Sequence, residues 1–357
     1  MRFITLFRIV LAFLVLYSHS FPIFLGKPDV AVPIFWKTSI SFGTLAVGGF
    51  FCLSGLLLYN SASNLSFQDW LKRRALRLFP AYALCLLFCS FVIAPIASLL
   101  HSGSLDGYLN FGPIGPFGYF WNNLFMPVGI TYSLNDTFID SPYGIYSGAS
   151  VVNGSIWSLP YEIRSYFVIA IICYVFSSRM RDRFIPLLAC LTFLGYLNSS
   201  NPVFQRIVGP LWIFEDSLFL QLLTVFLIGA CFGVYSKKIF LSYGLLICLF
   251  LTYFLSTYHA KLLSTIGIST LGLIPFIIAV KIPKGLFNYP IFTWDISYGF
   301  YLYSFPIQQL MVVTFPNANF RTLLLYSTLL TGIIAAISFK ILEAPMIQFG
   351  KRKSINT

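Results

Sequence analysis

The chain has 357 residues, of which 58% are hydrophobic and only 10% are charged. A soluble domain carries about 25% charged residues, so this composition excludes a water-soluble globular protein and predicts an all-α polytopic membrane protein. The formal net charge of +12 could point to nucleic acid. No basic block is long enough to bind one, so we expect no nucleic-acid partner.

Ten apolar windows of about the length of a membrane span follow one another along the chain. They lie at about 3–24, 40–60, 78–100, 158–177, 184–200, 217–235, 239–257, 263–281, 292–315 and 322–342. Ten spans put both termini on one side, and most of the 23 Lys and Arg residues fall on that side. The positive-inside rule therefore predicts cytoplasmic termini, with one transmembrane domain over residues 1–350 and a basic cytoplasmic tail at 351–357.

The first window carries two polar residues that are costly in lipid, Arg8 and His19. Eleven residues make three helical turns plus about 20°, so both lie on one helix face, about 16 Å apart along the axis. Titratable residues inside a span are functional candidates by default. The alternative is that Arg8 snorkels to a headgroup and His19 lies in the outer interface.

The second window is rich in glycine, including Gly48 and Gly49. Bare backbone allows close approach either of another helix or of a thin ligand arm. Ser54, in the sequence FCLSG, does not lie in a G-x-S-x-G elbow, so the pattern does not make it a nucleophile.

A basic cluster with Arg73, Arg74 and Arg77 begins the third window. Arg74 and Arg77 are three residues apart and share a helix face. Arginine forks suit phosphate oxygens, so the pair could hold a nucleotide diphosphate or 3′-phosphate. A topology anchor on anionic lipid is the alternative.

A long segment at about 101–156 contains no Lys or Arg and is rich in Gly, Pro and aromatic residues. We expect an external loop, in which residues 117–131 are apolar but too short to span. Its aromatic side chains could pack on sugar rings or form an interfacial belt.

Two carboxylates stand near the ends of windows. Glu162 opens the fourth window in WSLPYE, and Glu343 closes the last window in ILEAP. A carboxylate there needs a partner or a polar cavity; a structural ion pair is the plain alternative for both. The seven cysteines lie in apolar runs without a CxxC, and only three histidines exist, so we expect no bound metal.

Six motifs occur in order over nearly the whole chain: R-x10-H, GGFFxxSG, R-x-x-R followed by proline, WSLxxE, SYGxYLYxxPI and a terminal E-x-P. In this order the chain resembles the membrane-bound acyltransferase-3 family. One departure is Ser304, where many members of that family carry a histidine.

The resemblance implies acyl transfer from a cytoplasmic acyl-CoA, usually acetyl-CoA, to a hydroxyl of an extracytoplasmic glycan. The acceptors in that family include O-antigen, exopolysaccharide and other glycans or lipids, and its members lie in the bacterial inner membrane. The partners expected for this chain are therefore acetyl-CoA, a surface glycan or its lipid-linked precursor, and membrane lipid.

These expectations assign roles to the residues named above. Arg73, Arg74 and Arg77, with Arg8, would hold the CoA phosphates, and the pantetheine arm would pass Gly48, Gly49 and Ser54. His19 would act as general base or as acyl carrier, and Glu162 would orient His19 or the acceptor.

A polytopic transporter or flippase of a lipid-linked glycan or small molecule is the alternative function. The two halves of the chain show no repeat, which weakens that alternative.

Overall fold

The computed structural model describes residues 2–29, 41–125, 130–208, 216–235, 265 and 294–352. Within these residues all regular elements are helical, apart from an isolated antiparallel bridge between Ser133 and Val151. The elements are α1 (Arg2–Leu25), α2 (Phe42–Ala62), α3 (Phe67–Phe88), η1 (Cys89–Ile93), α4 (Ala94–Ser102), α5 (Pro116–Leu124), α6 (Pro142–Ser147), η3 (Ser155–Ser158), α7 (Leu159–Val175), α8 (Ser178–Asn198), α9 (Pro202–Val208), α10 (Ser217–Tyr235), α13 (Ser297–Thr314), α14 (Phe320–Ser338), η6 (Phe339–Glu343) and α15 (Ala344–Lys351).

Six helical stretches of the described chain are long and apolar enough to cross a membrane. They are Ile4–Leu25, Phe42–Ala62, Phe67–Ser102, Ser155–Val175, Ser217–Tyr235 and Phe320–Lys351. Each coincides with one of the ten predicted windows, which confirms the all-helical class. The windows at 184–200 and 292–315 are helical as α8 and α13 but are not among the six. The windows at 239–257 and 263–281 lie outside the described residues except for Thr265.

Side-chain caps explain where several of these helices begin. The side chains of Ser41, Ser66 and Asn319 each accept a hydrogen bond from the backbone N–H three residues later, at the starts of α2, α3 and α14. The Ser66 cap, with Asp69 in the first turn, starts α3 well before the predicted window at 78–100. The basic cluster therefore lies inside the helix.

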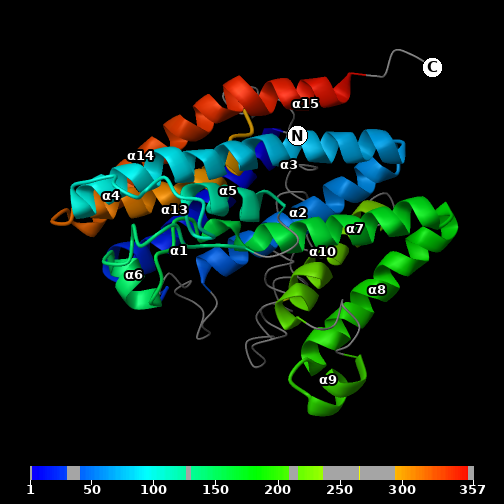
Figure 1. Cartoon of the computed structure of the whole chain (residues 1–357). Coiled ribbons are helices and arrows are strands. Elements are labelled where there is room, and N and C mark those ends of the chain that lie inside the picture. Colours follow the sequence, from blue (N-terminus) through cyan, green and yellow to red (C-terminus); the bar gives the residue numbers. More distant parts are fainter. Residues whose placement is uncertain are drawn as a thin grey trace.

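Two of the membrane-length helices contain a π-helical turn. η1 joins α3 to α4, and η6 joins α14 to α15. In both cases a proline, Pro95 or Pro345, follows within two residues. Proline lacks the N–H that would bond the preceding turn, so the chain changes its hydrogen-bond register there and the helix continues as one rod (Figure 1).

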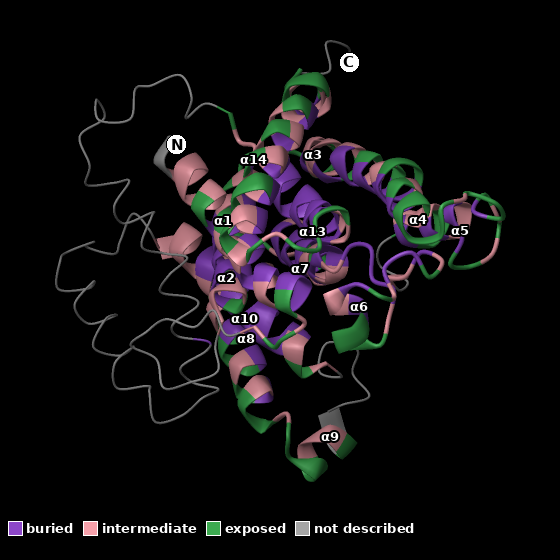
Figure 2. Ribbon diagram, turned by 90° about the vertical axis from the view of Figure 1, so that its left-hand side faces the viewer, coloured by how far each residue is buried: buried purple, intermediate pink, exposed green. Residues whose placement is uncertain are grey.

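Helix α13 forms the centre of the bundle. Most of its residues are buried, and it packs against α1 on one side and α14 on another (Figure 2). Its buried Gln308 donates to the Leu16 carbonyl at 3.0 Å and to Ser20 Oγ at 2.7 Å, both on α1. These bonds satisfy the side-chain N–H groups of Gln308, which would be costly to leave unpaired in such an interior.

Helix α2 packs closely on α10 through two glycines. A Cβ built on Gly55 would collide with the Phe226 carbonyl, and one on Gly229 would collide with the Cys52 carbonyl. Only residues without a side chain allow the two backbones to approach this far.

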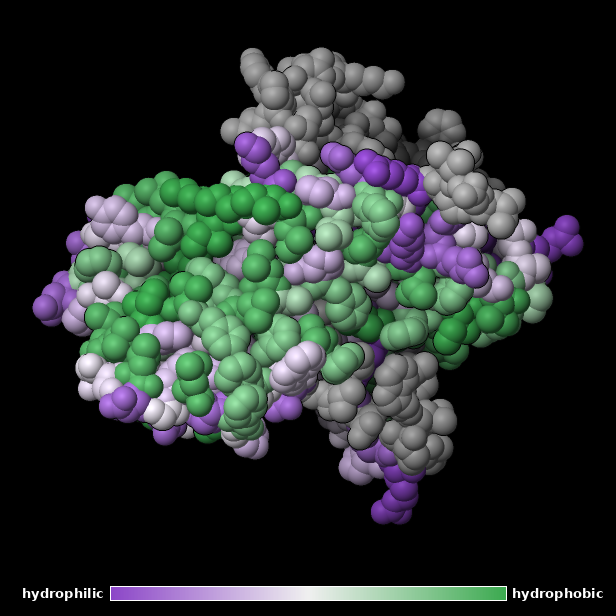
Figure 3. All heavy atoms as spheres, turned by 45° about the horizontal axis from the view of Figure 1, so that its top comes forward, coloured by the Kyte–Doolittle hydropathy of each residue, from purple (hydrophilic) through white to green (hydrophobic). Residues whose placement is uncertain are grey.

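One face of the molecule is broadly hydrophobic (Figure 3). The exposed apolar side chains of α3, α4 and α14 include Phe79, Leu87, Leu99, Leu325, Leu329 and Ile333. Large exposed apolar surfaces are rare in soluble proteins. This surface suits contact with lipid.

The predicted external loop connects the end of α4 to η3, and its described residues are folded. α5 is nine residues long, about 13 Å, so it is too short to cross a bilayer; residues 126–129 of this segment are outside the described chain. The buried Asn123 donates to the Tyr119 and Thr131 carbonyls at 2.9 and 2.8 Å. Tyr119 is fully buried, whereas Phe111 and Trp121 are exposed, so the loop aromatics divide between core and surface.

Candidate active site

Residues from five separate α-helices line one cavity, which we call the arginine cavity. α1 contributes Arg8, α3 contributes Arg74 and Arg77, α7 contributes Glu162, and α2 contributes Ser54. Aromatic and apolar side chains complete the wall, among them Val47, Phe50, Phe51, Tyr166, Tyr298 and Tyr301. Three cations and one carboxylate thus face a space bounded by low-dielectric groups, where charge interactions are strong.

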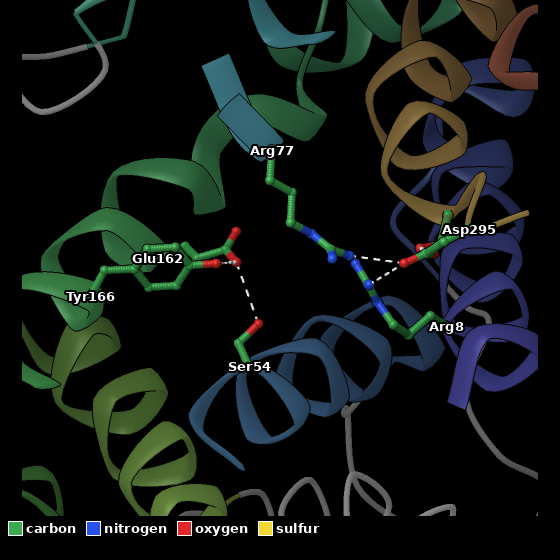
Figure 4. A network of polar contacts seen from close by, with 7 residues as sticks. Arg8, Ser54, Arg77, Glu162, Tyr166 and Asp295 are labelled. Carbon is green, nitrogen blue, oxygen red and sulfur yellow. Dashed lines mark hydrogen bonds and ion pairs between the residues drawn. The ribbon is translucent and has the colours of Figure 1, made fainter. Parts of the chain in front are cut away.

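Asp295 joins two of these arginines (Figure 4). Its Oδ2 lies 2.5 Å from Arg8 Nη1 and 2.8 Å from Arg77 Nη2, and Ser297 Oγ donates to its Oδ1 at 2.6 Å. Asp295 precedes α13 and lies in none of the six candidate spans. The two guanidinium groups beside this buried carboxyl favour its ionised form. The ionised carboxylate ties α1, α3 and α13 together.

Glu162 lies across the cavity from this ion-pair cluster (Figure 4). Its Oε1 accepts hydrogen bonds from the Tyr166 hydroxyl and from Ser54 Oγ, the latter at 3.4 Å. Glu162 and Tyr166 are four residues apart and therefore share a face of α7. Among the described contacts, Glu162 is oriented by these two hydroxyls and not by His19.

The side chains of the basic cluster point in two directions. Arg74 faces the arginine cavity, and its Nη2 donates to Ser61 Oγ at 3.2 Å, while its buried Nε has no hydrogen-bond partner in the described structure. Arg73 does not line the cavity; its side chain packs beside Gly350 of α15. Helical spacing explains this, because neighbouring residues point about 100° apart.

Gly48 and Gly49 are buried on α2, but neither lines the arginine cavity. A Cβ on Gly49 would stand 3.1 Å from Leu11 Cδ1, so this glycine faces α1. Ser54 does line the cavity. Of the α2 residues predicted to contact the pantetheine arm, the structure therefore places Ser54 at the cavity, Gly49 against α1 and Gly48 outside the cavity lining.

His19 lines a second cavity, which we call the histidine cavity. Its walls include Val15 and Ser18 of α1, Val47 of α2, Trp157 of η3 and Gln221 of α10. The buried Nδ1 of His19 has no hydrogen-bond partner in the described structure, and the ring meets Phe305 edge-on with centroids 5.3 Å apart. Arg8 and His19 thus share α1 but face different cavities.

Two motif residues with open roles are buried in the packing. Ser304 is fully buried, and its Oγ donates to the Tyr301 carbonyl at 3.1 Å. Glu343 is also buried and accepts from Ser338 Oγ at 3.2 Å. No ion pair of Glu343 occurs among the described residues.

Sequence reasoning missed Asp295 and Tyr166. A signal existed for each: Asp295 is a carboxylate inside a predicted apolar window, which is costly without a partner, and Tyr166 follows Glu162 by one helical turn. No group of three or more His, Cys, Asp or Glu side chains in the described ranges could hold a metal ion.

Comparison with known proteins identifies the family. An acyltransferase domain model (acyltransferase 3) matches residues 1–342. An O-acetyl transferase of Shigella phage Sf6 is 26% identical over 362 aligned positions, covering 94% of this chain and 93% of that protein. No solved structure matches the chain significantly. With six membrane-length helices among its described residues and a family match over almost its entire length, this chain belongs to the acyltransferase-3 family and is a multi-pass membrane acyltransferase.

Proposed function

We propose that this protein is an O-acetyltransferase of the bacterial inner membrane. It takes an acetyl group from cytoplasmic acetyl-CoA and transfers it to a hydroxyl of an extracytoplasmic glycan, such as O-antigen or exopolysaccharide, or its lipid-linked precursor. The family match and the O-acetyl transferase of the Sf6 phage support the reaction class. The excess of Lys and Arg on one side of the predicted spans supports the orientation.

The arginine cavity is the proposed donor site. Guanidinium forks bind phosphate oxygens in bidentate geometry, and Arg8, Arg74 and Arg77 converge on one space. Each guanidinium carries five N–H donors, of which the bonds to Asp295 engage one nitrogen from Arg8 and one from Arg77. The unpartnered Nε of Arg74 is a further donor already buried at this wall.

His19 is the proposed catalytic residue. The acceptor hydroxyl oxygen attacks the thioester carbonyl carbon while neutral His19 takes the hydroxyl proton. The C–S bond then breaks, the acetyl group remains on the acceptor, and the proton passes to the departing CoA sulfur. In the second route, a His19 ring nitrogen attacks first and carries the acetyl group to the acceptor. Both routes need His19.

The arrangement along α1 carries this proposal. Arg8 of α1 lines the arginine cavity together with Arg74 and Arg77 of α3. His19 lines the histidine cavity and lies eleven residues, or about 16 Å, further along α1 than Arg8. A donor with charged phosphates at one end and a thioester on a long flexible arm fits such a separation. The phosphates stay at the cations while the thioester reaches the histidine.

The test is a His19→Ala variant in the full-length protein, assayed for glycan acetylation and for release of CoA thiol. General base catalysis contributes about 10²- to 10⁴-fold, so we expect activity to fall by at least about 100-fold at normal membrane abundance. His101→Ala is the matched control, since that histidine is half-exposed and lines neither of these cavities. Wild-type acetylation by His19→Ala would overturn both routes together.

A single-turnover experiment separates the two routes. The protein is mixed with acetyl-CoA in the absence of acceptor, and its intact mass is measured. A gain of one acetyl group that His19→Ala lacks indicates the acyl carrier, and an unchanged mass indicates the general base.

A further inference from the structure

The arginine cavity and the histidine cavity have one lining residue in common, Val47 of α2. This residue is 5% exposed, and it is the residue at which the two linings meet. Val47 therefore lies where the linings of the two cavities adjoin.

Helix α2 lines both cavities, and apart from Leu53 and Leu57 at the arginine cavity most of its lining residues lie on one stripe. Gly43 and Thr44 line the histidine cavity, and Phe50, Phe51 and Ser54 line the arginine cavity. These positions are separated by three or four residues, so they form one stripe along the helix. Val47 lies in the middle of that stripe, one turn from the nearest residue of either cavity.

Outside α2, the lining residues of η3 and α1 also divide between the two cavities in the order of the chain. Trp157 lines the histidine cavity, and the next residue, Ser158, lines the arginine cavity. On α1, Arg8 lies in one cavity and Val15 in the other, two turns along the helix. The two cavities therefore follow one another along α1, α2 and η3, which line both, with Val47 at their junction.

We infer that Val47 is a specificity-determining residue that limits the size of the acyl group able to reach His19. The inference rests on the proposed function: with the donor phosphates at the arginines, the acyl end of the donor must pass Val47 before it meets His19. A β-branched side chain on a helix has essentially one rotamer, so Val47 cannot swing aside as a longer side chain would. Small acyl groups such as acetyl fit this junction better than longer ones.

Two substitutions test the inference in opposite directions. Val47→Ala removes bulk at the junction, and Val47→Phe adds it. The full-length protein is assayed with acetyl-, propionyl- and butyryl-CoA, and kcat/KM is measured for each donor. One methylene changes discrimination by about 10- to 200-fold, so we expect Val47→Ala to raise the butyryl-to-acetyl ratio at least about tenfold. We expect Val47→Phe to reduce acetyl transfer by a similar factor with an unchanged Kd for CoA.

Leu45→Ala is the matched control. Leu45 is equally buried on α2 but lines neither cavity, so its truncation reports general loosening of the helix and should leave the donor ratio unchanged. An unchanged ratio in Val47→Ala, or equal changes in Val47→Ala and Leu45→Ala, overturns the inference even if Val47→Phe does not fold. Absence of acetyl transfer or CoA binding in the wild-type protein would instead refute the proposed function.

Discussion

At the scale of single residues, Asp295 organises the arginine cavity. It is separated from Arg8 by 287 positions and from Arg77 by 218 positions, yet it bonds both. A buried pair is stable only when each charge keeps a partner, so one carboxylate holds two cations that would otherwise repel each other. The sequence marked the arginines as candidates through their spacing, but nothing local in it indicated which carboxylate would meet them.

The arginines themselves give a test of donor binding. In an Arg74→Ala, Arg77→Ala double variant, Asp295 keeps its bond to Arg8, so the buried carboxylate is not left alone. A hydrogen bond to a charged group contributes about 1.5–3 kcal/mol, and we therefore expect the Kd for CoA to rise at least about tenfold. Equilibrium binding of CoA to the purified protein measures this.

Arg179→Ala with Arg183→Ala is the control pair for that experiment. Both arginines are exposed on α8 and line neither cavity. A double variant of the α3 pair that binds CoA as tightly as this control would show that Arg74 and Arg77 are topology anchors and not phosphate ligands.

At the scale of elements, α13 differs most from a simple span. Its sequence predicts a lipid-crossing window at 292–315, but the helix is the buried centre of the bundle and carries buried Ser304, Gln308 and Gln309. Gln309 donates to the Val151 carbonyl of the loop at 2.8 Å. Lipid tails are as apolar as leucine, so hydrophobicity alone does not distinguish a helix surrounded by lipid from one surrounded by protein.

The α2–α10 interface allows a clean packing test. Gly55→Ala places a methyl group against the Phe226 carbonyl, which cannot move without shifting α10. Gly332→Ala on α14 is the same change with its nearest neighbour, Phe300, 4.0 Å away. Overpacking costs about 1–3 kcal/mol, whereas alanine is favoured over glycine in a helix by about 1 kcal/mol.

We therefore expect Gly55→Ala to lower the Tm of the protein in detergent and Gly332→Ala to keep or raise it. Thermal unfolding followed by fluorescence compares the two. Equal Tm values would mean that α2 and α10 do not approach as closely as the structure shows.

At the scale of the whole molecule, the longest helix of the described chain provides a measure of orientation. Phe67–Ser102 has 36 residues, about 54 Å, and exceeds an apolar core about 30 Å thick. Both of its ends therefore extend beyond the core. Arg74 and Arg77 lie near its start and His101 near its end, so the side that each end faces also assigns a side to the arginine cavity.

Thiol labelling in intact spheroplasts checks the orientation. In a background without the seven native cysteines, Gln68→Cys and Ser102→Cys place one exposed thiol at each end of this helix. With the cytoplasmic termini that the charge distribution predicts, an impermeant maleimide labels Ser102→Cys and leaves Gln68→Cys unlabelled until the membrane is opened. The reverse pattern would invert the topology and the proposed direction of transfer.

Composition and local pattern were sufficient for the class of the molecule. Apolar length predicted ten spans, of which six coincide with membrane-length helices in the described residues, and the ordered motifs carried a resemblance to the family that the comparison then showed. Helical spacing also placed Arg74 and Arg77 on one face, because that relation depends only on the turn of a single helix.

Only the tertiary structure decided which helices share a cavity. It brought Arg8, Arg77 and Asp295 together, turned Gly49 toward Leu11, and placed His19 in a separate space that meets the arginine cavity at Val47. These relations depend on how helices far apart in the chain rotate and pack against one another. Within an apolar environment that rotation is set by small residues, buried hydrogen bonds and ion pairs between helices, and not by the hydrophobicity of any one segment.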